Sequence, residues 1–451
     1  MTVATVDFSK DAGAMRPMHA VNNGPQHKYS AGQRISNLAA FREAGIPYAR
    51  THDASINYYY GGDHTVDVNA VFPDFDADES DPASYDFVLT DEYMRVIFAA
   101  GTKPFYRLGC KIEHWPKKYG TLPPPDFHKW ARICEHIIRH YTEGWADGFA
   151  YDMVYWEIWN EPDCPDDLDP VKKTCWGGTK AQFFELYAIT AKHLKSCFPH
   201  LKIGGPAVGT PAHDWSRDFL VHCKENALPL DFFSWHIYAK TPQEVVEMER
   251  YTHAMLEEVG LTETESVLNE WNYVRGWDDE EWIYSLRTEK GLKGASFTAA
   301  VMSASQYEAV DLLMYYDARP CIMNGLFDTD FVCDKLKGYY PFPMFSTLYR
   351  LGRAVPFAAN DAEIFGCAAK GEDGMAVMLT RYADEEAAEE KSLCLNLAGL
   401  PGVPVKITCS VLDGAHDLVP VHTELVTGRE ASLRLSLPLF TSYLLTVERN
   451  S

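Results

Sequence analysis

Residues 153–161 read MVYWEIWNE, and this stretch decides the fold because an apolar, aromatic run ends abruptly in polar side chains. Short runs of bulky apolar residues are typical of strands buried on both faces of a parallel sheet. Seven further runs of this kind occur upstream and downstream. They lie at 17–24, 47–53, 103–109, 202–209, 231–238, 266–273 and 310–317. We interpret all eight runs as strands of one sheet.

Segments of helical period separate these strands. The clearest begins after Gly178, where Thr179 and Gln182 have the spacing of a capping box. One face of the predicted helix then carries Phe183, Leu186, Tyr187, Thr190 and Leu194. Eight strands that alternate with helices predict an α/β fold, a (β/α)8 TIM barrel over residues 1–350. We expect residues 1–16 either to open the barrel or to join a β domain that follows it.

Beyond about residue 355 the period changes to short alternating runs with turns between them. These runs lie at 363–370, 375–382, 391–397, 405–413, 431–438 and 442–449. They predict a C-terminal antiparallel β-sandwich over residues 351–451, packed on the barrel. The acidic run DEEAAEEK at 384–391 is interpreted as a solvated loop between two strands.

The amino-acid composition limits the classes of molecule that this protein is expected to bind. A formal charge of -23 disfavours nucleic acids and anionic membrane surfaces, so neither is expected to bind. The first residues have no apolar signal segment, and no run of about 18 apolar residues occurs. The 11 cysteines are scattered and odd in number, which favours a reduced, cytoplasmic protein. Cys164 and Cys175 are close in sequence, and whether they interact stays open.

Polar side chains end most of the predicted strands. In a TIM barrel the carboxyl ends of the strands carry the active site. These ends hold His52, Arg107, Asn160, Glu161, His236, Tyr238, Glu270, Asn272, Tyr316 and Asp317. Two of them are glutamates on the fourth and seventh strands, which lie across a barrel from each other. Facing carboxyl groups are what glycoside hydrolysis requires.

The segment VYWEIWNEP (154–162) resembles the acid/base segment of clan A, a group of retaining glycoside hydrolases. With His236-Ile237-Tyr238 and Leu268-Asn269-Glu270, it resembles glycoside hydrolase family 39, the family of β-xylosidases and α-L-iduronidases. The resemblance covers nearly the whole chain. It implies that Glu161 is the acid/base and Glu270 the nucleophile of a double displacement that needs no cofactor.

The same resemblance implies roles in sugar binding. Asn160 would hydrogen-bond the sugar 2-hydroxyl, and His52 would hold glycone hydroxyls. His236 and Tyr238 would line the subsite, with Tyr238 orienting the nucleophile. Aromatic walls could come from Trp271, and also from Trp115, Trp176 and Trp277.

Two departures from the family pattern lie near the sugar pocket. The family commonly has glycine after the histidine of the second strand, whereas this chain has Asp53. The loop at 56–81 is also long and acidic. The sugar specificity therefore does not follow from the resemblance.

Other polar residues have structural interpretations. Glu157, deeper on the fourth strand, is expected to anchor a polar network, and Arg50 to support the nucleophile from inside the barrel. Glu113 is expected to be solvated. His19, His52 and His236 lack the spacing of metal ligands, so no metal is predicted.

The resulting expectation is a retaining exo-β-glycosidase, with β-xylosidase activity on short oligosaccharides as the first choice. An arabinosidase, a glucosidase or an endo-acting glycanase are alternatives within the enzyme class. A carbohydrate-binding barrel without catalysis is the alternative from another class. A homo-oligomer is left open by analogy with similar families.

Overall fold

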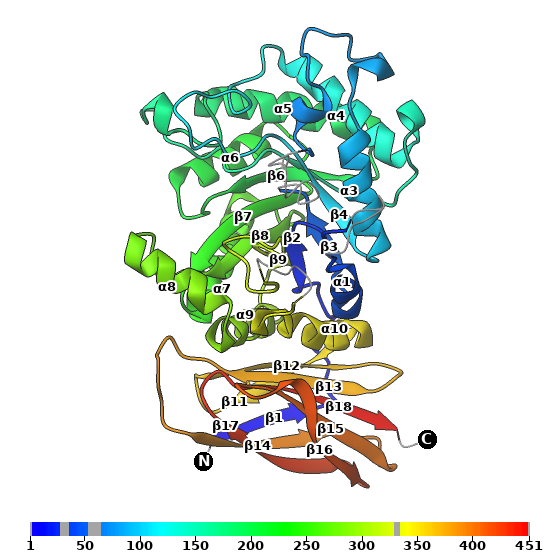
Figure 1. Cartoon of the computed structure of the whole chain (residues 1–451), viewed down its shortest axis with the longest axis vertical. Helices are drawn as coiled ribbons and strands as arrows, with labels where there is room; N and C mark the ends of the chain where they lie inside the picture. The colour runs from blue at the N-terminus through cyan, green and yellow to red at the C-terminus, as the bar shows by residue number, and fades with distance from the viewer. Residues whose placement is uncertain (1, 28–35, 53–64, 329–333, 450–451) are drawn as a thin grey trace.

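The computed structural model describes residues 2–27, 36–52, 65–328 and 334–449. Its first part is a closed barrel of eight parallel strands in chain order, as predicted. The strands are β2 (Ala20–Asn22), β3 (Tyr48–Arg50), β4 (Lys103–Leu108), β5 (Tyr155–Ile158), β6 (Lys202–Val208), β7 (Phe232–Ala239), β8 (Glu265–Tyr273) and β9 (Leu312–Tyr315). Each strand coincides with a run that the sequence singled out, and only β7 and β8 extend one residue beyond their runs. Figure 1 shows this barrel above a separate layer of strands.

Helices cover the outside of the barrel (Figure 1). They are α1 (Leu38–Ala44), α2 (Val68–Val71), α3 (Val88–Ala99), α4 (Phe127–Thr142), α5 (Lys180–Cys197), α6 (Asp214–Glu225), α7 (Pro242–Val259), α8 (Asp279–Glu289), α9 (Leu292–Ser305) and α10 (Pro341–Leu351). The predicted capping box begins α5, where the backbone N–H of Thr179 donates to Gln182 Oε1 at 2.9 Å. The five residues predicted on one face of this helix are all buried.

The second part is a β-sandwich of two sheets, which confirms the predicted fold class. One sheet has the order β11-β1-β14-β17 and the other β10-β12-β13-β18-β15-β16. Their bounds are β1 (Thr2–Asp7), β10 (Arg353–Val355), β11 (Phe357–Ala359), β12 (Ile364–Lys370), β13 (Met375–Arg381), β14 (Lys391–Ala398), β15 (Val405–Leu412), β16 (Asp417–Val426), β17 (Glu430–Leu437) and β18 (Ser442–Arg449). The N-terminal strand β1 thus lies in the sandwich and pairs parallel to β14, in an otherwise antiparallel sheet.

The barrel and the sandwich meet at α9 and α10, which lie between them in Figure 1. Helix α9 is buried along almost its whole length, as expected of a helix that is apolar all round. Ser296 on α9 donates to the backbone carbonyl of Arg381 at 2.8 Å. The sandwich is therefore packed on the barrel, as the sequence predicted. Within the described ranges, no helix combines the length and apolar character needed to cross a membrane.

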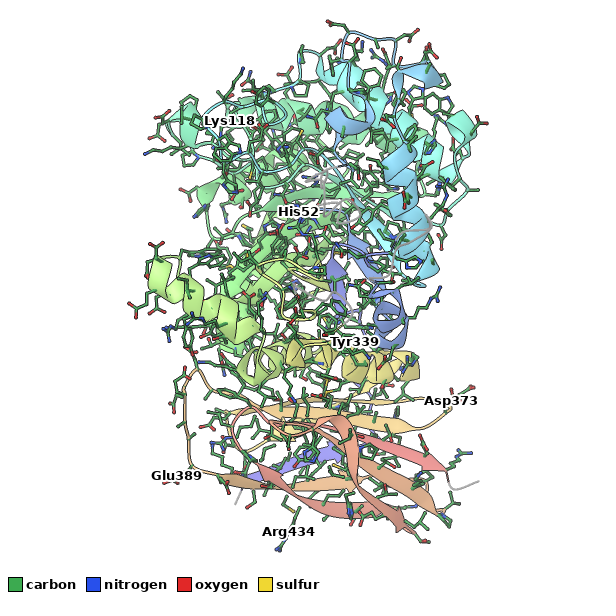
Figure 2. All side chains as sticks on the ribbon, in the orientation of Figure 1. His52, Lys118, Tyr339, Asp373, Glu389 and Arg434 are labelled. Atoms are coloured by element: carbon green, nitrogen blue, oxygen red, sulfur yellow. The ribbon has the colours of Figure 1, made fainter. Side chains whose placement is uncertain are left out.

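The acidic run that follows β13 is a loop, as predicted. Most of it is exposed, and Glu389 lies at the outer edge of the sandwich in Figure 2. Its first residue is only partly exposed, because Asp384 accepts a hydrogen bond from Tyr273 at 2.8 Å and pairs with Lys293 at 2.7 Å. The loop therefore also joins the two parts of the molecule.

Candidate active site

The end of β5 turns two consecutive polar side chains toward the barrel mouth. In a regular strand, neighbouring side chains point to opposite faces. Here the alternation breaks, because Trp159 and Glu161 adopt positive φ angles of 76° and 45°. The backbone N–H of Glu161 donates to the carbonyl of Ala207 on β6 at 2.8 Å, which holds the turn in place. Asn160 and Glu161 can therefore both serve one site.

A bulge on β8 directs the second glutamate, Glu270, toward the barrel mouth. Leu268 pairs with Trp235, but Glu270 pairs with His236, so Asn269 is one extra residue in the ladder. Bulges often re-aim side chains beside active sites. Asn269 then donates to Glu157 inside the barrel at 2.5 Å, while Glu270 reaches the mouth.

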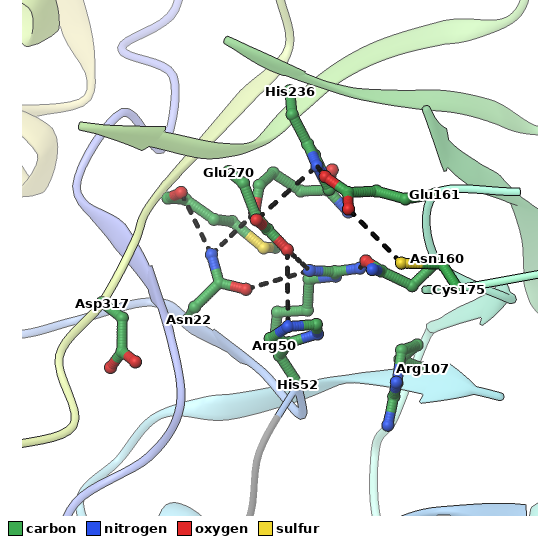
Figure 3. Close-up of polar contacts among 12 residues, drawn as sticks. Asn22, Arg50, His52, Arg107, Asn160, Glu161, Cys175, His236, Glu270 and Asp317 are labelled. Atoms are coloured by element: carbon green, nitrogen blue, oxygen red, sulfur yellow. Dashed lines mark hydrogen bonds and ion pairs between the residues drawn. The ribbon is translucent and has the colours of Figure 1, made fainter. Parts of the chain in front are cut away.

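Arg50 on β3 links the floor of the barrel to this mouth (Figure 3). Its guanidinium is wholly buried and donates to Glu157 and to Glu270, each at 2.7 Å. It also donates to Asn160 Oδ1 at 2.6 Å and to Asn22 Oδ1 at 3.1 Å. Glu157 also accepts from Ser234 at 2.6 Å. These contacts confirm that Glu157 anchors a polar network and that Arg50 supports Glu270.

His236 lies between the two glutamates. Its Nδ1 is 2.8 Å from Glu161 Oε1 and 3.6 Å from Glu270 Oε2. One carboxylate oxygen of each glutamate and a ring nitrogen of His236 all lie within 4.8 Å of one another. The structure thus brings Glu161 and Glu270 together, from opposite strands of the barrel.

The charges of the three groups shift one another's pKa values. Burial opposes the ionisation of Glu161, but the hydrogen bond and the charge of His236 outweigh it and hold the pKa of Glu161 below its ordinary value. Burial raises the pKa of Glu270, against the opposing charges of His236 and Arg50. Burial disfavours the His236 cation, yet the two carboxylates raise the pKa of His236. The protonated form of His236 and the ionised form of Glu161 therefore favour each other in the free site.

Tyr238 and His52 complete the surroundings of Glu270. The hydroxyl of Tyr238 donates to Glu270 Oε2 at 2.9 Å. His52 Nε2 lies 3.8 Å from Glu270 Oε1, and Figure 3 shows His52 near Arg50 and Glu270. Asn160 is buried, and its Nδ2 has no hydrogen-bond partner among the described residues. Asp53 and the first part of the loop at 56–81, residues 56–64, lie outside the described residues.

Three predicted positions need correction. Trp271 cannot form a wall of the sugar site, because it follows inward-facing Glu270 and points outward, wholly buried against Phe297 and Tyr315. Trp176 is also buried in the core. Glu113 is not solvated, because it is buried and accepts hydrogen bonds from the backbone N–H groups of residues 119–121.

Cys175 is a neighbour of Glu161 that the sequence did not predict. Its buried Sγ lies 3.6 Å from Glu161 Oε2 and donates to it. Burial raises the pKa of Cys175, so the thiol keeps its proton. Cys164 and Cys175 are both free thiols, which rules out a disulfide between them in this structure. This contact could not be predicted because Cys175 belongs to a loop whose path the sequence does not reveal.

The structure also locates the histidines and carboxylates that could be considered as metal ligands. His19 packs outside the barrel against Phe345 and Tyr349 of α10, away from His52 and His236. Glu161, His236 and Glu270 are close enough to hold an ion, but the Arg50 cation already binds Glu270. A second group, on the barrel surface between α4 and α5, consists of Glu135, His193 and Cys197.

Comparisons with known proteins bear on this site. Residues 33–317, more than half of the chain, match the family model of "Glycosyl hydrolases family 39". A β-xylosidase from Geobacillus stearothermophilus is 25% identical over 279 residues, which are 58% of this chain and 52% of that protein. The match thus spans about half the length of this relative.

Solved structures agree in fold. A glucosidase from Croceicoccus marinus has a TM-score of 0.80 and 21% identity, with all of both chains covered. A monomeric β-xylosidase from Caulobacter crescentus CB15 has a TM-score of 0.72 and 17% identity, again over all of both chains. At these identities the similarity shows a shared fold.

Proposed function

The chain belongs to glycosyl hydrolases family 39, and from that membership we propose that it is a retaining exo-β-glycosidase of the β-xylosidase type that acts on short oligosaccharides. The observation that carries the proposal is the closeness of Glu161 and Glu270, which present carboxylate oxygens within 4.8 Å of each other. Retaining enzymes hold these groups about 5–5.5 Å apart, whereas inverting enzymes need about 6.5–9.5 Å to admit a water. The short separation supports a double displacement.

In the first step Glu270 attacks the anomeric carbon while Glu161 protonates the departing oxygen. Arg50 and Tyr238 hold one oxygen each of Glu270 by the hydrogen bonds described above, so the nucleophile is oriented before the sugar arrives. In the second step water attacks the same carbon, Glu161 takes its proton, and the bond to Glu270 breaks.

His236 supplies the proton for the first step. Its Nδ1 contacts Glu161 Oε1 at 2.8 Å, so a proton can pass between them without any movement of the backbone. A bound sugar excludes water from Glu161, which favours the neutral carboxylic acid over the carboxylate. The proton that rests on His236 in the free site then moves to Glu161, where the leaving oxygen receives it.

Sugar recognition requires polar groups whose hydrogen-bonding capacity is not used up within the protein. The buried amide of Asn160 has its oxygen held by Arg50, while its Nδ2 faces no other described partner and can donate to a sugar hydroxyl. The match to a β-xylosidase over 279 residues supports xylose as the glycone. The likeness to a glucosidase in fold makes a β-glucoside the second substrate to test.

A panel of 4-nitrophenyl glycosides tests the proposal. We expect the highest kcat/KM on the β-D-xyloside, compared with the β-D-glucoside and the α-L-arabinofuranoside. Glu270→Gln is the matched control, because it keeps the shape of the side chain and removes the charge. Binding of xylo-oligosaccharides without any turnover would instead favour the carbohydrate-binding alternative.

The cytoplasmic location remains part of the proposal. The ten cysteines in the described parts of the chain are free thiols, which supports a reducing compartment. Titration of the protein, unfolded without reductant after purification from its native cell, should then detect all 11 thiols. A lower count caused by disulfides would contradict this location.

A further inference from the structure

We propose that a groove beside the catalytic mouth binds a neutral sugar residue of the leaving group, with Trp277 as its stacking surface. This inference rests on the proposed function, and it names the part of an oligosaccharide that the groove takes. It makes Trp277 a residue that determines specificity for oligosaccharides over simple glycosides.

Tyr238 links the groove to the reacting groups. It is a cavity of about 690 Å³ between the ends of β7 and β8 and the first turns of α7, within the size range of ligand pockets. Tyr238 lines it, and the hydroxyl of the same residue donates to Glu270 at 2.9 Å. A ligand in this groove would therefore lie beside the nucleophile.

The groove lies on the side of the leaving group. A second cavity of about 550 Å³ shares Ala212 with the first and is lined by Asp163, two residues after Glu161. Gly209 lies next to both acids, because a β-carbon there would lie 3.6 Å from a carboxylate oxygen of both Glu161 and Asp163. Since Glu161 must contact the departing oxygen, the sugar beyond that oxygen has this open path available.

Trp277 offers a fixed aromatic surface in the groove. It stacks on Trp282 with ring centroids 5.1 Å apart and meets the Tyr238 ring edge-on at 5.4 Å. Despite these contacts it remains 64% exposed, which is unusual for so large an apolar side chain. Tyr251 also lines the groove and is 48% exposed. Aromatic faces of this kind suit the apolar C–H face of a pyranose ring.

The polar lining favours a neutral ring. The charged side chains that line the same cavity are two cations and two carboxylates, so neither sign of charge dominates. They are Lys240, Arg275, Glu244 and Glu247. Ammonium and carboxylate groups can donate to and accept from sugar hydroxyls.

Matched substrates isolate the contribution of Trp277. The glycosyl fluoride of the preferred sugar has no sugar in the leaving group, whereas the corresponding tetrasaccharide has three. For Trp277→Ala, the ratio of kcat/KM on the tetrasaccharide to kcat/KM on the fluoride should fall about tenfold, as expected when a hydrophobic contact to substrate is lost. Trp115→Ala is the control, because Trp115 is 78% exposed and lines neither cavity.

The outcomes separate this inference from the proposed function. An unchanged ratio for Trp277→Ala would overturn the inference, and so would an equal loss on both substrates, which would mean that Trp277 acts by holding Tyr238. A wild-type protein that hydrolyses neither substrate would overturn the proposed function itself. Equal falls in the ratio for Trp115→Ala and Trp277→Ala would also refute a specific role for this groove.

Discussion

Replacing Tyr238 by Phe removes one hydroxyl and leaves its ring in place. That hydroxyl donates to Glu270 Oε2 at 2.9 Å and stabilises the carboxylate form. A hydrogen bond to a charged group contributes about 1.5–3 kcal/mol. Since 1.36 kcal/mol corresponds to one pKa unit, the pKa of Glu270 should rise by about 1–2 units. The nucleophile must be ionised, so the acidic limb of the pH profile should move to higher pH by the same amount.

The assay is kcat/KM against pH in the free enzyme, with a 2,4-dinitrophenyl glycoside of the preferred sugar. This leaving group departs without protonation, so the acidic limb reports the charge on the nucleophile and not on Glu161. Tyr187→Phe is the matched control, because Tyr187 also loses a buried hydrogen bond, to the carbonyl of Pro229 at 2.9 Å, on the outer side of the barrel. An acidic limb that Tyr238→Phe leaves at the wild-type pH would refute the assignment of Glu270.

Two further predictions concern other buried groups. Cys175→Ala should raise the pKa of Glu161 by less than about one unit, because the thiol hydrogen bond lowers this pKa and such bonds contribute about 0.5–1 kcal/mol. The pKa is followed through the carboxyl chemical shift of Glu161 by carbon NMR, and a fall in this pKa would contradict the contact. Burial raises the pKa of Glu249 to about 8. Between about pH 4.5 and 8 the carboxyl group of Glu249 stays protonated in the native state, whereas in the unfolded chain it is ionised. The free energy of unfolding should therefore fall by roughly 3–5 kcal/mol as pH rises through this range. Glu249→Gln should remove this decline in urea unfolding, and an equal decline in both proteins would exclude Glu249 as its source.

Much of the barrel could be predicted because its strands are short apolar runs that end in polar residues. The prediction of the sandwich was less complete, because it omitted β16. This strand is exposed on most of its length and carries Pro420 where its pairing with β15 is irregular. Such an edge strand lacks the alternation that marks a half-buried one. The pairing of β1 with β14 joins segments almost 400 residues apart, which no local pattern reveals.

The functional site likewise contains some residues that the sequence revealed and others that it did not. Glu161 and Glu270 could be found because each ends an apolar strand. Trp271 was misplaced although alternation around Glu270 would have pointed it outward, toward α9. Asn22 was not singled out for the site, yet it accepts from Arg50 at 3.1 Å. It also donates to the backbone carbonyl of Asn269 on β8 at 2.6 Å, a contact that arises because closure of the barrel brings the last strands beside the first.

The central claim is that Glu161 and Glu270 perform a double displacement with retention. Glu161→Ala should still be glycosylated by an activated aryl β-glycoside, because that leaving group needs no acid, and should then stall at hydrolysis. Azide needs no general base and can enter the space of the missing carboxylate. The most direct measurement is the anomeric configuration of the glycosyl azide that forms, determined by NMR. We predict a β-glycosyl azide, the configuration of the substrate. An α-glycosyl azide, or no rescue in a folded variant, would contradict the account.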